Sequence, residues 1–264
     1  MSPVDPPESF PGVVARLRAA GCVFAEEEAD LLLAEARSAA ELEHLLERRA
    51  GGEPLEYVLG WALFCGLRMR VEPGVFVPRR RTEALVREAA GLAEAGAIVV
   101  DLCCGTGAVG AALLSARPEL GLDLLSADLD PVAVRCARVN LPGRTVVEGD
   151  LFAPLPADLR GRVALLLVNA PYVPTGSIER MPPEARVHEH RLALDGGPDG
   201  LDVQRRVAAA AGGWLAPGGS LLIETSARQA PVTSALFGRN GLVPRTAHHE
   251  DVDGTVVIGT RPRT

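Results

Sequence analysis

The sequence predicts an α/β fold: an open, mostly parallel sheet with helices on both faces, preceded by a small helical domain and a hairpin linker. Apolar residues before residue 50 recur at helical spacing, and those within 51–78 alternate with polar residues. After Thr82, short apolar segments alternate with helical ones, which favours parallel strands. We therefore expect an N-terminal helical domain over residues 1–60, a hairpin linker over 61–80 and an α/β domain over 81–264.

Each part has its own sequence signals. The helical domain is predicted from apolar residues at helical spacing, namely Val13, Leu17, Leu31, Leu32 and Leu46. In the linker, Leu67, Met69 and Val71 alternate, and Pro73–Gly74 indicates the turn of the hairpin. The α/β domain should contain strands at 97–102, 122–127, 145–147, 163–168 and 220–224, and a closing hairpin of 242–246 with 255–260.

The composition narrows the class of protein. The 264 residues are 47% hydrophobic and carry a net charge of −7, which argues against a broad basic face for duplex DNA. Five cysteines without C-x-x-C spacing favour free thiols, so no structural metal is expected. The opening residues lack a secretory pattern, and no apolar run approaches a membrane span. We expect a cytoplasmic monomer without a membrane or stable nucleic-acid partner.

A glycine-rich loop follows the first predicted strand, over residues 101–110 (DLCCGTGAVG). Its glycines let the backbone approach a ligand closely, as in nucleotide-binding enzymes. Asp101, however, stands at the strand tip, where a carboxylate repels phosphate and attracts a cation. The loop therefore favours S-adenosylmethionine, which carries an ammonium and a sulfonium, over a dinucleotide.

Two further acids end the next two strands. Asp128 can accept hydrogen bonds from ribose hydroxyls, and Asp150 from an adenine amino group, with Leu151 or Phe152 packed on the ring. The three acids are 27 and then 22 residues apart, about one strand and helix each, so all fall on the carboxyl edge of the sheet. The alternative is that each acid only caps a helix. The candidate cofactor-binding residues are Asp101, Cys103, Gly105, Thr106, Gly107, Asp128, Leu129, Asp150, Leu151 and Asn169.

The fourth strand runs into a second candidate loop, Asn169-Ala170-Pro171-Tyr172, on the same edge. An amide nitrogen is a poor nucleophile, so a site that methylates it should hold its NH2 with acceptors and aim it at the methyl group. The Asn169 side-chain oxygen and the Ala170 carbonyl can supply these acceptors, and Tyr172 offers a flat wall. Alternatively, this is a turn in which Asn169 bonds its own backbone.

With these loops, the chain resembles the HemK/PrmC family of protein N5-glutamine methyltransferases, which act on the Gly-Gly-Gln motif of peptide-chain release factors. Further matching segments are 52–60 (GEPLEYVLG), 77–83 (VPRRRTE), 193–201 (ALDGGPDGL) and 217–219, which leads to Glu224 and Gln229. The resemblance implies a class I, Rossmann-like methyltransferase domain, S-adenosylmethionine as cofactor, a release factor as protein substrate, and an N-terminal domain that recognises it. It also places Arg79–Arg81 at the substrate opening.

Three residues depart from the family pattern. Cys103 replaces the first glycine of D-x-G-x-G-x-G, so it should have φ below zero or carry strain. Ala170 replaces the first proline of N-P-P-Y and loses its fixed φ, at roughly 1 kcal/mol in ordering the loop. His190 stands where the family usually has proline after Glu189. These changes suggest a divergent member.

Three other functions compete with this interpretation. A nucleic-acid methyltransferase of the N6-adenine type would use the same acceptors, with a flipped base on Tyr172. A catalytically inactive binding protein would explain Ala170 and Cys103, although it would not need the loop 169–172. An NAD-dependent oxidoreductase is disfavoured by Asp101. The motifs His188-Glu189-His190 and His248–Asp251 lack metal-ligand spacing.

Overall fold

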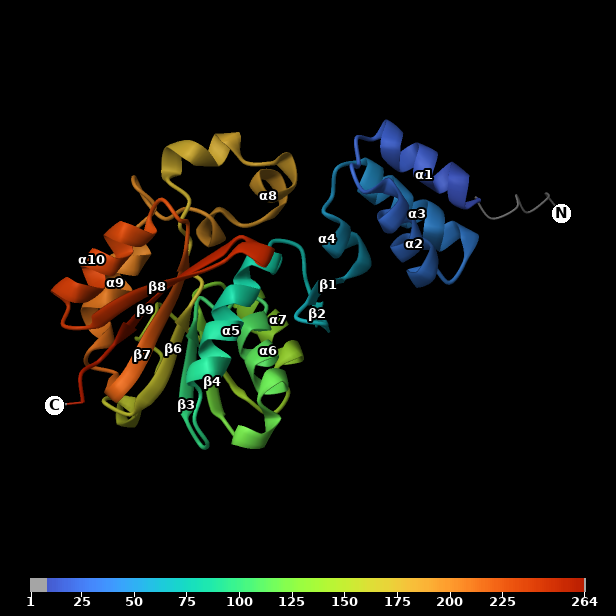
Figure 1. Cartoon of the computed structure of the whole chain (residues 1–264). Helices are drawn as coiled ribbons and strands as arrows, with labels where there is room; N and C mark the ends of the chain where they lie inside the picture. Colours follow the sequence, from blue (N-terminus) through green and yellow to red (C-terminus); the bar gives the residue numbers. More distant parts are fainter. Residues whose placement is uncertain (1–8, 264) are drawn as a thin grey trace.

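The computed structural model describes residues 9–263, and its first helices form a group of their own (Figure 1). They are α1 (Phe10–Ala19), α2 (Ala25–Glu35), α3 (Ala39–Ala50) and α4 (Leu55–Leu59). The apolar residues at helical spacing, Val13, Leu17, Leu32 and Leu46 among them, meet in one buried cluster. Ser38 caps α3 by accepting a hydrogen bond from the Glu41 backbone N–H at 3.1 Å.

A hairpin follows α4, with β1 (Trp61–Phe64) paired antiparallel to β2 (Leu67–Arg70). A turn does form at Pro73–Gly74, where the Val75 N–H donates to the Glu72 carbonyl at 3.1 Å, but the prediction that it is the turn of the hairpin is wrong. The two strands are joined at Cys65–Gly66. Both of these residues have positive φ, 49° and 77°, which is the geometry of a two-residue hairpin turn. A cysteine carries no sequence signal for that conformation, whereas the Pro-Gly pair does. Residues 71–79 instead connect the hairpin to the part of the chain that forms the central sheet.

The central sheet has seven strands among the described residues, in the order β5-β4-β3-β6-β7-β9-β8. All run parallel except β9, which is antiparallel to both of its neighbours. The prediction of a mostly parallel sheet is therefore confirmed. The strands are β3 (Ile98–Leu102), β4 (Asp123–Asp128), β5 (Thr145–Glu148), β6 (Val163–Val168), β7 (Leu215–Thr225), β8 (Val243–His249) and β9 (Gly254–Thr260).

Helices cover both faces of this sheet (Figure 1). One face carries α5 (Glu83–Leu92), α6 (Ala108–Ala116) and α7 (Pro131–Asn140); the other carries α9 (Asp202–Ala211) and α10 (Ala230–Arg239). Within β6, Leu165 and Leu167 belong to one core and Leu166 and Val168 to the other. Continuous apolar strands of this kind are expected when both faces are buried.

The segment from Val173 to Leu201 lies between β6 and α9 and contains only short helices: η4 (Thr175–Arg180), α8 (Pro183–His188) and η5 (Arg191–Ala193). Figure 1 shows α8 beyond one end of the sheet. The segment is tied to the linker by a bridge between Gly74 and Glu189. Within residues 9–263, none of the helices combines the length and the apolar character needed to span a bilayer.

Candidate functional site

A cavity of about 480 Å³ opens at the carboxyl ends of β3, β4 and β6. The chain leaves β3 toward β4 on one side and later returns to pair β6 on the other side, so the strand order reverses at β3. Crevices at such reversal points are the usual ligand sites of open α/β sheets. All of the candidate residues except Gly107 line this cavity: Asp101, Cys103, Gly105, Thr106, Asp128, Leu129, Asp150, Leu151, Asn169, Ala170, Pro171 and Tyr172.

The glycines of the first loop have different tasks. Gly105 lines the cavity, has a φ of 54° and has no atom within 4 Å of the position that a Cβ would take. Gly107 starts α6 with a φ of 75°, and a Cβ there would lie 2.8 Å from Leu141 Cδ1. It therefore allows α6 and α7 to pack closely and does not line the cavity. Gly105 is the glycine whose backbone can approach a ligand.

Cys103 adopts the strained of its two predicted conformations, with a φ of 55°. Left-handed backbone costs a non-glycine residue about 1–2 kcal/mol. Burial and the nearby Asp128 carboxylate raise the pKa of its thiol above the usual value. The thiol therefore stays protonated at neutral pH. The strained backbone at Cys103 is part of the conformation of the glycine-rich loop.

Asp101 is the most deeply buried acid of the cavity. Its carboxylate is 1% exposed and accepts one hydrogen bond, from the Gly110 backbone N–H at 3.2 Å. Burial raises the pKa of this carboxyl to about 7, and the Asp128 charge adds to the effect. Such a group is stabilised by a cation. The donor set therefore fits the ammonium and sulfonium of S-adenosylmethionine and disfavours a phosphate.

Asp128 connects the glycine-rich loop to the start of α7. Its two oxygens accept hydrogen bonds from the backbone N–H groups of Gly105 at 2.8 Å and Asp130 at 2.9 Å. Each carboxylate oxygen has a second lone pair, so both can still accept from the hydroxyls of a ribose. Burial raises the pKa of this carboxyl above its usual value.

The third acid lies at the rim of the cavity. Asp150 is half-exposed and forms an ion pair of 2.6 Å with Arg206 of α9. Leu151 lines the cavity, whereas Phe152 stacks on Trp214 with ring centroids 5.5 Å apart. Of the two residues predicted to pack on an adenine ring, Leu151 alone lies among the cavity-lining residues.

The second loop contributes amide and aromatic groups to the same cavity. Asn169 Nδ2 donates to Thr82 Oγ1 at 3.5 Å, so the amide is held by its NH2 end. The Tyr172 hydroxyl donates to Glu224 Oε1 at 3.4 Å. Glu224 is 1% exposed, and burial raises the pKa of its carboxyl to about 7 and that of Tyr172 to about 12. The loop 169–172 thus rests on a polar group at the end of β7.

The segment 173–201 covers the cavity and is fixed at two points near its helix α8. His190 Nδ1 pairs with Asp130 Oδ2 at 2.5 Å, beside the cofactor loop. Arg79 pairs with the buried Glu189 at 2.5 Å. Arg79–Arg81 were expected at the substrate opening. Of these three residues, Arg79 and Arg81 line the cavity.

The helical domain contacts the same segment through Arg49. This buried arginine binds Glu28 of α2 at 2.6 Å and 3.0 Å and Glu184 of α8 at 2.6 Å. Glu184 lines the cavity. Sequence reasoning missed this contact, along with Thr82 and Arg206, because the partners are distant in the chain. Within residues 9–263, no group of three or more potential metal ligands is clustered.

Comparison with known proteins identifies relatives of this arrangement. Residues 66–182 match the family model "Methyltransferase small domain". The release factor glutamine methyltransferase of Geobacter sulfurreducens is 40% identical over 201 residues, 75% of this chain and 69% of the relative. That of Cereibacter sphaeroides is 35% identical and covers 94% of each chain.

Two other similar proteins are methyltransferases whose names do not mention a release factor. A 4-amino-L-phenylalanine/4-methylamino-L-phenylalanine methyltransferase of Streptomyces pristinaespiralis is 38% identical over 75% of this chain and 70% of its own. A methyltransferase structure from Pyrococcus furiosus superposes with a TM-score of 0.57 at 15% identity, over 76% of this chain and 91% of that one. The structural match supports the fold alone.

Proposed function

Since this chain belongs to the family of release factor glutamine methyltransferases, we propose that it methylates the side-chain amide nitrogen (N5) of a glutamine in a protein. The substrate is a glutamine of a release factor, in keeping with the names of its relatives, and the family resemblance implies that this glutamine belongs to the Gly-Gly-Gln motif. The observation that carries the proposal is that the loop 169–172 and the buried carboxylate of Asp101 line one cavity.

S-Adenosylmethionine supplies an electrophilic methyl group when it is bound in this cavity. Asp101 would bind a cationic group, Asp128 would accept from the ribose hydroxyls, and Leu151 would pack on the adenine, because all three line the cavity. Leu129 is half-exposed at the mouth and can cover the other side of the base. Cys103 and Thr106 complete the wall of the cofactor end, and Asp150 lies at its rim.

The loop 169–172 holds and orients the substrate amide. Asn169 Oδ1 and the Ala170 carbonyl accept hydrogen bonds from the glutamine NH2, and the Tyr172 ring supports the flat amide. Pro171 restricts Ala170 to an extended backbone. The bound cofactor would give up its methyl group to the amide nitrogen as the sulfur–methyl bond breaks, and the excess proton of the amide would leave to solvent. Orientation by the loop, and not a general base, provides the catalysis.

The test is incubation of recombinant release factor with this protein and isotopically labelled S-adenosylmethionine, followed by mass spectrometry. We expect label on the motif glutamine and none on a release factor in which that glutamine is alanine. Asn169→Ala should lower turnover more than tenfold with little change in cofactor affinity. Asn240→Ala is the matched control, because that amide binds only a helix carbonyl, of Leu236, remote from the cavity. Label elsewhere, or equal turnover by Asn169→Ala, contradicts the proposal.

One observation favours a second candidate substrate, a primary aryl amine of a small molecule. The Streptomyces pristinaespiralis relative, named for 4-amino-L-phenylalanine, is nearly as similar to this chain as the release factor enzymes are. Two acceptors and an aromatic wall also fit an aniline NH2. Methylation of 4-amino-L-phenylalanine, and not of the release factor, in the same assay would support this alternative.

A further inference from the structure

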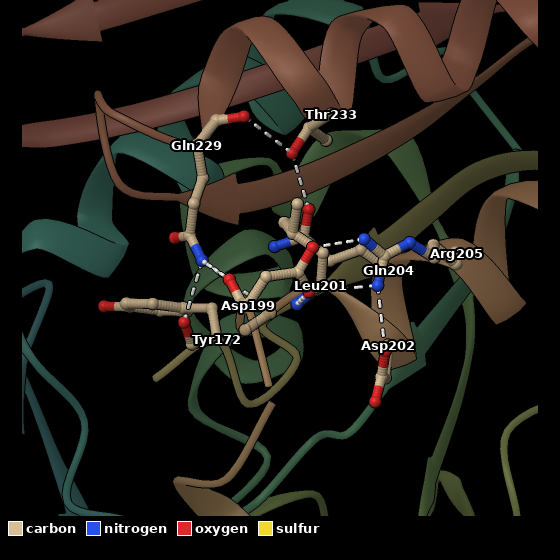
Figure 2. Close-up of polar contacts among 9 residues, drawn as sticks. Tyr172, Asp199, Leu201, Asp202, Gln204, Arg205, Gln229 and Thr233 are labelled. Carbon is tan, nitrogen blue, oxygen red and sulfur yellow. Dashed lines mark hydrogen bonds and ion pairs between the residues drawn. The ribbon is translucent and has the colours of Figure 1, made fainter. Parts of the chain in front are cut away.

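The Gln229 side chain contacts the reactive loop from behind (Figure 2). This residue precedes α10, and its Nε2 donates to the Tyr172 carbonyl at 3.0 Å. The same nitrogen donates to the Asp199 carbonyl at 3.1 Å. Gln229 thereby joins three segments that are distant in the chain: the end of the loop 169–172, the glycine-rich turn 196–200 and the start of α10.

The orientation of the Gln229 amide follows from its neighbours. Its two N–H groups point to two carbonyl oxygens, which can only accept, and its Oε1 accepts from the Ser226 hydroxyl at 2.7 Å. A carboxylate of the same shape could not replace it, because an oxygen would then face the carbonyls of Tyr172 and Asp199. The contacts thus require an amide at this position.

The backbone around Tyr172 is packed too closely for other side chains to take over this contact. A Cβ on Gly200 would lie 2.3 Å from the Tyr172 carbonyl oxygen, and a Cβ on Gly196 would lie 2.7 Å from that of Pro171. Val173 continues the loop by donating to the Leu194 carbonyl at 3.1 Å. The backbone of residues 171–173 therefore packs directly against the backbone of residues 194–200. Gln229 supplies the side-chain donor to the Tyr172 carbonyl in this region.

Helix α10 holds Gln229 in place through a buried polar group. Thr233, one turn further along α10, donates to Gln204 Oε1 of α9 at 2.6 Å, and Gln204 Nε2 donates to Thr225 Oγ1 at 3.3 Å. Gln204 and Thr233 are both fully buried. Figure 2 shows Gln229 projecting from this anchored start of α10 toward Tyr172. Hydrogen bonds therefore fix the start of α10, from which the Gln229 side chain projects, and the Tyr172 carbonyl, to which it donates.

We propose that Gln229 is a positioning residue for methyl transfer, which acts by fixing the Tyr172 carbonyl and hence the orientation of the loop 169–172. Ala170 lacks the fixed φ of proline, so the order of this loop depends on contacts from outside it. The effect on turnover rests on the proposed glutamine methylation. The effect on the loop itself does not, so the two can be separated by experiment.

The test compares Gln229→Ala, Gln229→Glu and wild type in hydrogen exchange and in steady-state methylation. Exchange of the amides in 172–176, which include the bonded N–H groups of Val173 and Thr175, should become at least fivefold faster in both variants. The kcat should fall at least tenfold, whereas the dissociation constant of the cofactor should change less than twofold. Asn240→Ala is the control, because it removes an amide-to-carbonyl bond at the opposite end of α10.

The pH dependence of Gln229→Glu separates positioning from a general loss of structure. A carboxyl facing two carbonyl oxygens should have a raised pKa, and its protonated form can donate one hydrogen bond. The kcat of Gln229→Glu relative to wild type should therefore rise severalfold from pH 8 to pH 6, while that of Gln229→Ala stays constant. The nearby titratable groups are common to all three proteins: Asp199 and Asp202, which each pair with Arg205, and Glu224, which binds the Tyr172 hydroxyl and itself titrates near pH 7.

Unchanged exchange over 172–176 in Gln229→Ala would overturn the proposal, as would faster exchange with unchanged kcat. If wild type transfers no methyl group to the release factor, the proposed function is wrong. The exchange measurement then still decides whether Gln229 holds the loop.

Discussion

Asn169 Nδ2 lies 3.5 Å from Thr82 Oγ1, and this contact determines which end of the Asn169 amide is left for a substrate. Burial raises the pKa of the Glu224 carboxyl, and a hydrogen bond from the Thr82 hydroxyl partly opposes this rise, so the single hydroxyl proton is directed to Glu224. The Thr82 oxygen is then an acceptor, which binds the NH2 of Asn169. The Asn169 Oδ1 remains available as an acceptor for the substrate amide.

Replacing Thr82 by valine should therefore impair turnover without affecting the cofactor site. The Asn169 amide loses its fixed orientation, and we expect kcat to fall about tenfold, corresponding to about 1.4 kcal/mol. Thr82→Ser keeps the hydroxyl and should retain most of the activity. Steady-state kinetics with the release factor measures both variants. Equal kcat for Thr82→Val and Thr82→Ser would show that the hydroxyl does not orient Asn169.

Binding of S-adenosylmethionine should depend on pH through Asp101. The pKa of this carboxyl is about 7 in the free protein, and the ionised form is the one that attracts a cation. Affinity should then be highest above pH 8 and fall up to tenfold per pH unit below the pKa. Isothermal titration calorimetry from pH 5.5 to 8.5 provides the measurement, with Asp101→Asn as the control. A flat profile for wild type would contradict the role of Asp101.

Asp101→Asn should also stabilise the free protein at neutral pH. The folded-state pKa is raised from 3.8 to about 7. Below pH 3.8 the Asp101 carboxyl therefore does not lower the free energy of unfolding of wild type, and this free energy decreases as the pH rises from 3.8 toward 7. A shift of about 3 units corresponds to about 4 kcal/mol as an upper limit. The difference in the free energy of unfolding, variant minus wild type, should therefore be larger at pH 8 than at pH 4. The increase should be about 2–4 kcal/mol. Urea denaturation at both pH values tests this difference.

Cys103→Gly should be tolerated, in contrast to a branched residue at the same position. Glycine removes the strain of a φ of 55° but adds unfolded-state entropy, so stability should change by less than about 1 kcal/mol. Cys103→Val should lose about 2 kcal/mol or more, since β-branched residues strongly disfavour positive φ. Chemical denaturation compares them. A valine variant as stable as wild type would show that the loop relaxes.

Arg49→Ala should destabilise the protein far more than Glu184→Gln. The arginine is buried against Glu28, and its removal leaves that carboxylate without its partner, at about 3–5 kcal/mol. Glu184 is half-exposed, so its loss should cost less than about 1 kcal/mol. Thermal denaturation of the two variants provides the comparison, and similar melting temperatures would contradict this ranking.

The sequence predicts those parts of the fold and site that depend on local patterns. Continuous apolar strands and the acids at their tips place Asp101, Asp128 and Asp150 on one edge, and the cavity includes all three. The hairpin turn at Cys65–Gly66 was missed because positive φ at a cysteine has no local signal. The contacts of Gln229 with Tyr172 and of Thr82 with Asn169 could not be predicted, because these two contacts join segments more than fifty residues apart. Such contacts depend on how the loops pack once the sheet has formed.

The order of the last strands has a consequence for folding kinetics. Strand β9 lies between β7 and β8, so β7 keeps an open edge until residues 254–260 pair with it. An unpaired edge rich in apolar residues, such as Leu221 to Ile223, is a template for association with another chain. Docking of the closing hairpin should therefore be the concentration-sensitive step of refolding, in which aggregation competes with completion of the sheet.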